Sequence, residues 1–91
     1  MEKVSSRGFA RVSKAMGYFG IGRSAFYDRV KRGLLPGIVH IGGAAVLLED
    51  EMAEVAIALA AGLPDSDVFT LVQRQITERA RRAVALREAA Q

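Results

Sequence analysis

The pattern of apolar and polar positions along the chain predicts four helices with one β-hairpin between the second and third. A first short helix over 14–19 follows Ser13, a good N-cap, and carries an apolar stripe. Gly20 ends this helix, and a second helix lies between Gly22, which can serve as its N-cap, and Gly33, which suits the left-handed position after a helix end. Two helices separated by a three-residue glycine turn have the spacing of a helix-turn-helix, whose second helix enters the major groove of DNA.

The second helix has two different faces. Phe26 and Val30 lie four residues apart and form its apolar side. The opposite face carries two cations, a hydroxyl, a phenol and a carboxylate, supplied by Arg23, Ser24, Tyr27, Asp28 and Lys31. Groups of these kinds bond to phosphates and base edges, so the face indicates a DNA recognition helix, with Arg23 as the principal base reader. An ordinary solvated face is the alternative that this segment alone leaves open.

A β-hairpin is predicted after the turn signal Pro36-Gly37. Two apolar, partly β-branched runs flank Gly42-Gly43, which is typical of a hairpin turn. A hairpin directly after a recognition helix is a wing, and the amides of its two glycines are candidates for contact with the DNA backbone. His40 is a further candidate, and an ordinary surface or packing residue is the alternative for it.

The third helix begins at the acidic residues 49–51, as the helix dipole favours, and is apolar nearly all round. We therefore expect it to be buried on more than one side. The fourth helix runs from about Val68 to the end of the chain and is longer than a small core requires. It either folds back across the third helix or packs on a neighbouring subunit. In the second case, its candidate oligomerisation residues are Phe69, Val72 and Ile76.

These elements give a mainly α fold with a small β-hairpin, that is, a winged helix-turn-helix plus a long C-terminal helix. The 91 residues suit one small domain. We expect a basic N-terminal arm over 1–11, a winged helix-turn-helix DNA-binding domain over 12–62 and a C-terminal helix over 63–91.

Charge is segregated along the chain. Residues 1–33 hold eight Lys or Arg against two acids, a net +6, and residues 34–67 hold six acids and no Lys or Arg, a net −6. The remaining residues are net +3. The first cationic block coincides with the expected recognition helix, as a phosphate-binding surface requires. Lys14 and Arg32 therefore join Lys31 as candidates for phosphate contacts.

Several functions are disfavoured by composition. The chain has no cysteine and one histidine, so it offers no ligand set for a metal and no thiolate chemistry. No nucleotide-binding loop and no catalytic constellation is present, so we expect no enzyme activity, no cofactor and no small-molecule substrate. The longest apolar run, nine residues, is too short to span a membrane. The N-terminus lacks a signal-peptide core, and we expect a cytoplasmic, nucleoid-associated protein.

Residues 20–42 read GIGRSAFYDRVKRGLLPGIVHIG. This segment resembles the AlpA-like and phage excisionase-type winged-helix proteins, distant relatives of the MerR DNA-binding domain, whose pattern is approximately G[LI]SRSTLYRLIKEGxFPxPVxLG. The match covers roughly residues 11–60. The chain departs from the pattern at the capping serine, at one apolar helix position, at the arginine after the wing glycine and at the tryptophan before the last helix. The residues at these places are Gly22, Arg29, Gly43-Ala44 and Leu48.

The resemblance implies a small DNA-binding protein of a prophage or integrative element. Some members are excisionases, or recombination directionality factors, which load cooperatively on attachment-site DNA and bias an integrase toward excision. Others are transcriptional regulators that bind a promoter. The expected partners are double-stranded DNA, further copies of the chain and a tyrosine integrase. A function of another class, a protein–protein adaptor for a recombinase, stays open because the third helix is so apolar and the fourth so long.

Overall fold

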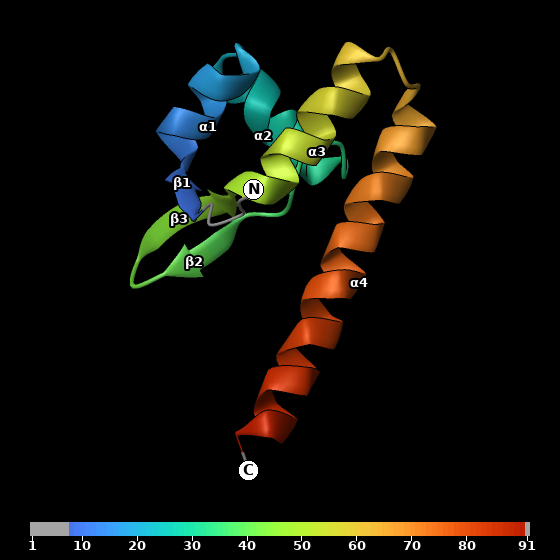
Figure 1. The fold of residues 1–91 in the computed structure, drawn as a ribbon. Helices are drawn as coiled ribbons and strands as arrows, with labels where there is room; N and C mark the ends of the chain where they lie inside the picture. The colour runs from blue at the N-terminus through green and yellow to red at the C-terminus, as the bar shows by residue number, and fades with distance from the viewer. Residues whose placement is uncertain (1–7, 91) are drawn as a thin grey trace, which may run out of the picture.

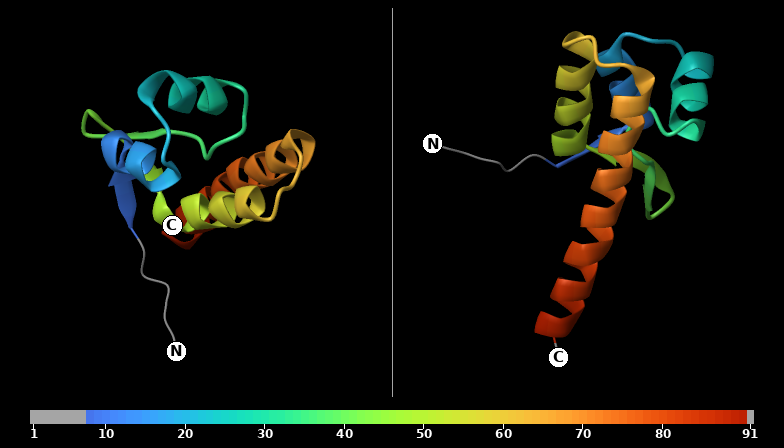
Figure 2. Two further views of the ribbon diagram at one scale, coloured as in Figure 1. Left: turned by 90° about the horizontal axis from the view of Figure 1, so that it is seen from above. Right: turned by 90° about the vertical axis from the view of Figure 1, so that its right-hand side faces the viewer.

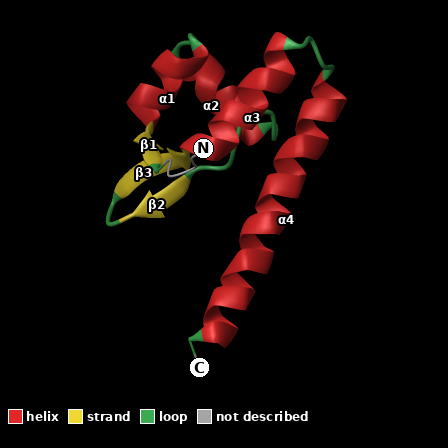
Figure 3. Ribbon diagram, in the orientation of Figure 1, coloured by secondary structure: helices red, strands yellow, loops and turns green. Residues whose placement is uncertain are grey.

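A computed structural model of the chain describes residues 8–90. Its elements are β1 (Phe9–Arg11), α1 (Val12–Phe19), α2 (Arg23–Lys31), β2 (Val39–Ile41), β3 (Ala44–Leu48), α3 (Glu49–Ala60) and α4 (Asp65–Ala89) (Figure 1). Helices predominate, and the strands form one small antiparallel sheet (Figure 3). The prediction of a mainly α fold with a small β component is confirmed.

The turn between α1 and α2 occupies residues 20–22. Gly20 ends α1 with φ 68°, in the left-handed region that favours glycine. Gly22 precedes α2 as an extended N-cap without a side-chain hydrogen bond, at the position that the sequence predicted. α1 begins at Val12, before the Ser13 cap that the sequence suggested, because the chain passes directly from β1 into this helix.

The sheet has β3 at its centre, with β1 and β2 antiparallel on either side. The predicted hairpin is confirmed: Val39 of β2 lies opposite Val46 of β3, and both turn glycines have positive φ, 55° and 89°. The strand β1 is a correction. Residues 9–11 were expected in a loose arm, but they pair with β3, and Ala10 is buried in the core. Residues 1–7 of that arm lie outside the described residues.

The core is formed by residues of all four helices, of β1 and β3 and of the loop after α2. Its largest fully buried side chains come from α2, that loop, β3, α3 and α4: Phe26, Leu35, Pro36, Leu47, Met52, Val55, Val68 and Val72. α3 packs on β3 and on α4, as expected for a helix buried on more than one side. Its outer side remains in solvent, since Ile57 is exposed.

α4 folds back along α3 through its first half, and its second half extends beyond the rest of the chain (Figure 1). From Ala80 onward every described residue of this helix is exposed. The buried side of α4 consists of Val68, Val72 and Gln75, whereas Phe69 is 45% and Ile76 43% exposed. The structure therefore assigns Val72 to the internal core rather than to a subunit contact. Gln75, a polar residue, can face α3 because Glu51 and Glu54 of that helix accept its hydrogen bonds.

Gly33, directly after α2, occupies a position that tolerates no side chain. Its φ is 75°, and a Cβ built there would lie 2.8 Å from Cδ1 and Cε1 of Phe69. We expect Gly33→Ala to lower the free energy of unfolding by about 1–3 kcal/mol, because the substitution combines backbone strain with a steric clash. Urea unfolding followed by circular dichroism measures the change.

Gly17→Ala is the matched control for this substitution. Gly17 lies within α1, its φ is not positive, and a Cβ built there meets no atom within 4 Å. Alanine is the better helix former, so Gly17→Ala should leave stability unchanged or raise it by up to about 1 kcal/mol. An unfolding midpoint of Gly33→Ala equal to that of the wild type would contradict the close packing of Phe69 on Gly33.

Candidate nucleic-acid interface

α2 presents one polar face to solvent and docks on the core with the other. Phe26 is fully buried, and Val30 is partly buried beside it. The five residues predicted for the polar face are all exposed and lie together on this helix: Arg23, Ser24, Tyr27, Asp28 and Lys31. The ring of Tyr27 meets that of Phe26 edge to face, with centroids 5.5 Å apart. The core residue Phe26 therefore restrains the Tyr27 ring, whereas most of the other side chains on the polar face extend into solvent.

The hairpin lies on the same side of the molecule as α2. In the right-hand view of Figure 2, α2 (teal) and the β2–β3 hairpin (green) both project to the right, and α3 lies on the opposite side. The tip residues Gly42 and Gly43 are exposed, as is His40 on β2. The tip carries no charged side chain, so its contribution to binding an anion is limited to backbone amides and this histidine.

Arg32, just after α2, is shared between two carboxylates. Its Nη1 lies 3.3 Å from Oδ2 of Asp28, and its Nη2 lies 3.7 Å from Oδ2 of Asp65 at the start of α4. All three side chains are exposed, so each pair contributes little to stability. In the structure Asp28 pairs with Arg32. The positive charge of Lys31 is therefore less neutralised than that of Arg32.

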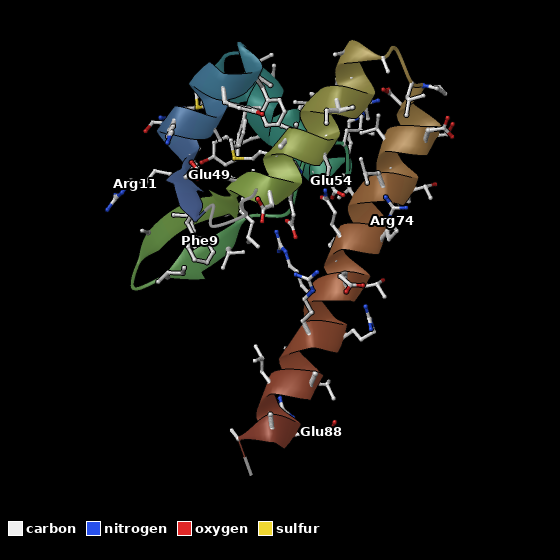
Figure 4. All side chains as sticks on the ribbon, in the orientation of Figure 1. Phe9, Arg11, Glu49, Glu54, Arg74 and Glu88 are labelled. Carbon is white, nitrogen blue, oxygen red and sulfur yellow. The ribbon has the colours of Figure 1, made fainter. Side chains whose placement is uncertain are left out.

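Lys14 is also paired. Its Nζ lies 3.0 Å from Oε2 of Glu49, whose other carboxylate oxygen accepts a hydrogen bond from the Gly8 amide at 3.2 Å. Figure 4 shows Glu49 at the start of α3, close to β1. The sequence proposed Lys14 for phosphate contact and did not reveal this pair, because the two residues lie far apart in the chain. The Lys14 side chain is still mostly exposed.

Arg29 occupies the inner side of α2, where the family pattern has an apolar residue. Its side chain is partly buried, and among the described residues no acceptor bonds its Nη2. Arg29 therefore does not belong to the exposed polar face.

A polar cluster joins α4 to α3 and to the loop after α2. The guanidinium of Arg79 donates from Nε to Oε2 of Glu51 at 2.9 Å, from Nη2 to Oε1 of Glu51 at 2.5 Å, and from Nη2 to the carbonyl oxygen of Gly37 at 2.8 Å. Gln75 donates to the carbonyl oxygen of Glu51 and to the carboxylate of Glu54. No sequence pattern revealed this cluster, because Gln75 and Arg79 lie more than twenty residues from the groups that they bond.

An open groove lies between the start of α3 and the second half of α4. Acidic residues of α3 face arginines of α4 across it, and it ends on Ala83 and Leu86. Glu54 and Arg74 mark the two helices in Figure 4. Glu78 also lines the groove, and hydrogen bonds from Arg81 and Arg82 hold the pKa of its carboxyl below the usual value. Much of the charge at this groove is therefore satisfied within the chain, which leaves α2 as the better candidate for binding an anion.

Comparison of the chain with protein-family models, with curated proteins and with solved structures finds no match. Within residues 8–90, no group of His, Asp and Glu side chains is placed to hold a metal ion. No helix in the same range combines the length and apolar character needed to cross a membrane.

Proposed function

We propose that this chain is a sequence-specific double-stranded DNA-binding protein, a winged helix-turn-helix in which α2 enters the major groove and the β2–β3 hairpin is the wing. The observation that carries the proposal is the polar face of α2, whose two cations and two hydroxyl groups are exposed while Phe26 anchors the opposite face in the core. In this proposal the hairpin, which lies on the same side of the molecule as α2 (Figure 2), contacts the same duplex.

The proposed roles follow from position on α2. Arg23 lies in the first turn, the part of a recognition helix that contacts base edges, and its guanidinium matches the two acceptors of guanine. Ser24 and Tyr27 supply hydroxyl groups for base edges or phosphates. Lys31, in the last turn, lies where the helix crosses the DNA backbone. The wing glycines and His40 supply further backbone contacts.

The biological role that we propose is that of an excisionase of a mobile element, loading in several copies on attachment-site DNA. A domain of this size buries little surface on DNA, so cooperative assembly is the expected route to high affinity. Binding of a promoter as a transcriptional regulator is the alternative, because the same recognition surface serves both roles.

A gel-shift titration tests the proposal. The probes are the promoter and the DNA ends that flank the protein's own gene, with random duplex as competitor, at two salt concentrations. A ladder of complexes that resists competitor supports cooperative excisionase loading, and one shifted species on the promoter supports a regulator. No shift at low salt would refute DNA binding and favour the adaptor function.

Lys31→Ala should weaken binding to every duplex alike and reduce the slope of log K against log salt by about 1, because it removes one phosphate contact. Fluorescence anisotropy on a specific and a random duplex, over a series of salt concentrations, measures both effects. Arg87→Ala is the control, since it removes the same charge from the distal end of α4, far from α2 (Figure 1). A slope unchanged by Lys31→Ala would show that this side chain does not contact a phosphate.

Asp65→Asn should strengthen binding to random duplex by about 1.5–5-fold, because it releases Arg32 from one of its two carboxylates. Asp67→Asn removes an equal charge from the same turn of α4 and has no ion pair among the described residues. Anisotropy titrations of both variants at low salt isolate the effect of Arg32. Equal gains in the two variants would mean that general charge, and not release of Arg32, accounts for the change.

A further inference from the structure

α4 contacts the segment that follows α2 at three successive places. Asp65 pairs with Arg32, the ring of Phe69 covers Gly33, and Arg79 donates a hydrogen bond to the carbonyl oxygen of Gly37. These contacts span the connection between α2 and the β2–β3 hairpin, from its first residue almost to the start of β2.

The contact at Gly33 restrains the end of α2. The space where a side chain would stand is filled by Phe69, and the next amide, that of Leu34, is still bonded to the Arg29 carbonyl oxygen of α2 at 2.8 Å. Leu34 itself is buried. The chain at the end of α2 therefore contacts the Phe69 ring through Gly33 and the core through Leu34, so a shift of this segment displaces that ring.

The contact at Gly37 restrains the other end of the connection. Glu51 holds the Arg79 guanidinium with two hydrogen bonds, and the side chains are largely buried, at 26% exposed for Arg79 and 11% for Glu51. The donor that reaches the Gly37 carbonyl oxygen is thus fixed by α3 as well as by α4. Pro36, directly before Gly37, is fully buried and limits the loop further.

We propose that α4 is a brace that sets the position of α2 relative to the hairpin, with Phe69 and Arg79 as positioning residues for DNA recognition. This inference rests on the proposed function, since it assigns these residues a role in the same DNA-binding surface. Neither side chain belongs to the polar face of α2. Base readout requires atoms placed to within a fraction of an ångström, whereas lysine contacts with phosphates tolerate small displacements. Loss of the brace therefore lowers discrimination between sequences more than it lowers overall affinity.

Phe69→Ala and Ile76→Ala form the matched pair that tests the brace. The two residues lie on the same helix and are almost equally exposed, 45% and 43%, but Phe69 alone of the two covers Gly33. The measurement is the ratio of dissociation constants for a random duplex and for the duplex that the full-length wild type selects from a random library. We expect Phe69→Ala to lower this ratio about 3–10-fold with random-duplex affinity unchanged, and Ile76→Ala to leave the ratio unchanged.

A second pair of variants tests the hydrogen bonds of Arg79 to Glu51 and Gly37. Arg79→Gln removes the donors to Glu51 and Gly37, and Arg74→Gln removes the same charge from an exposed residue of α4. Circular dichroism melting of each variant establishes that it is folded at the assay temperature. Arg79→Gln is more prone to unfold than Phe69→Ala, because Arg79 is the more buried of the two side chains. If Arg79→Gln does not fold, Phe69→Ala still tests the inference. A lower ratio in Arg79→Gln with an unchanged ratio in Arg74→Gln is the supporting result.

Two results would overturn the brace. A folded Phe69→Ala variant with the wild-type ratio would show that the contact does not position α2. Equal losses in Phe69→Ala and Ile76→Ala would assign both residues to a contact between copies of the chain. A wild type with no preference among duplexes would refute the proposed function and with it the role in recognition. In that case, hydrogen exchange of the Leu34 amide still tests whether Phe69 restrains the end of α2. The exchange should be faster in Phe69→Ala than in Ile76→Ala. Equal exchange rates in the two variants would refute the brace itself.

Discussion

Replacement of Phe26 by alanine is expected to lower the free energy of unfolding by about 3–5 kcal/mol. Phe26 is fully buried and is the residue through which α2 docks on the core. A domain of this size has roughly 5–15 kcal/mol of stability, so the loss is a large share of the total and should lower both the urea midpoint and the melting temperature. Urea and thermal unfolding followed by circular dichroism measure the loss.

Tyr27→Ala is the natural comparison, because it truncates the neighbouring ring on the exposed face of the same helix. Its effect on the free energy of unfolding should be below about 1 kcal/mol, whereas its effect on DNA binding should be clear. If Tyr27→Ala were the more destabilising of the two, the face of α2 that docks on the core would be wrongly assigned, and the proposed DNA-binding surface with it.

Local features of the fold were predictable because each depends on residues close in sequence. Gly33 after α2 and Gly42-Gly43 in the hairpin turn have positive φ, which glycine adopts readily, and Gly22 precedes α2 in an extended conformation. The exposed face of α2 was predictable for the same reason, since helical periodicity alone places its five residues together.

Features that depend on distant residues were not predictable. β1 is three residues long, and only its pairing with β3 distinguishes it from a basic arm. The buried side of α4 includes Gln75, which shares a helix face with Val68 and Val72; its polar character suggested exposure, but its hydrogen-bond partners lie on α3. Arg79 is similar: its charge suggests exposure, whereas Glu51 and Gly37 bind its guanidinium inside the fold.

In the candidate site, too, the contacts between residues distant in sequence were not predictable. The sequence identified the cations but not their partners, so Lys14 and Arg32 looked equivalent to Lys31. The structure separates them, since Lys14 pairs with Glu49 and Arg32 is shared by two carboxylates. Lys31 is therefore the stronger candidate for a phosphate contact, and Asp65 emerges as a residue that modulates the site from outside α2.

Arg23→Ala should cost about 1–3 kcal/mol in binding of the specific duplex, or roughly 5–150-fold in dissociation constant, and should relax the preference at one base position. Arg23 is the first residue of α2, is exposed, and has no ion pair among the described residues. It is therefore available to donate two hydrogen bonds to a guanine without first breaking a contact within the chain. Anisotropy titrations on the selected duplex and on single-base variants of it measure both effects.

Arg23→Lys separates base reading from charge. Lysine keeps the positive charge but lacks the planar fork that pairs with two acceptors at once, so random-duplex affinity should be retained while discrimination is lost. If Arg23→Ala weakened specific and random duplexes equally, and Arg23→Lys restored both, Arg23 would be a phosphate contact. Sequence reading would then belong to Ser24 and Tyr27, the remaining hydrogen-bonding side chains in the first half of the α2 face.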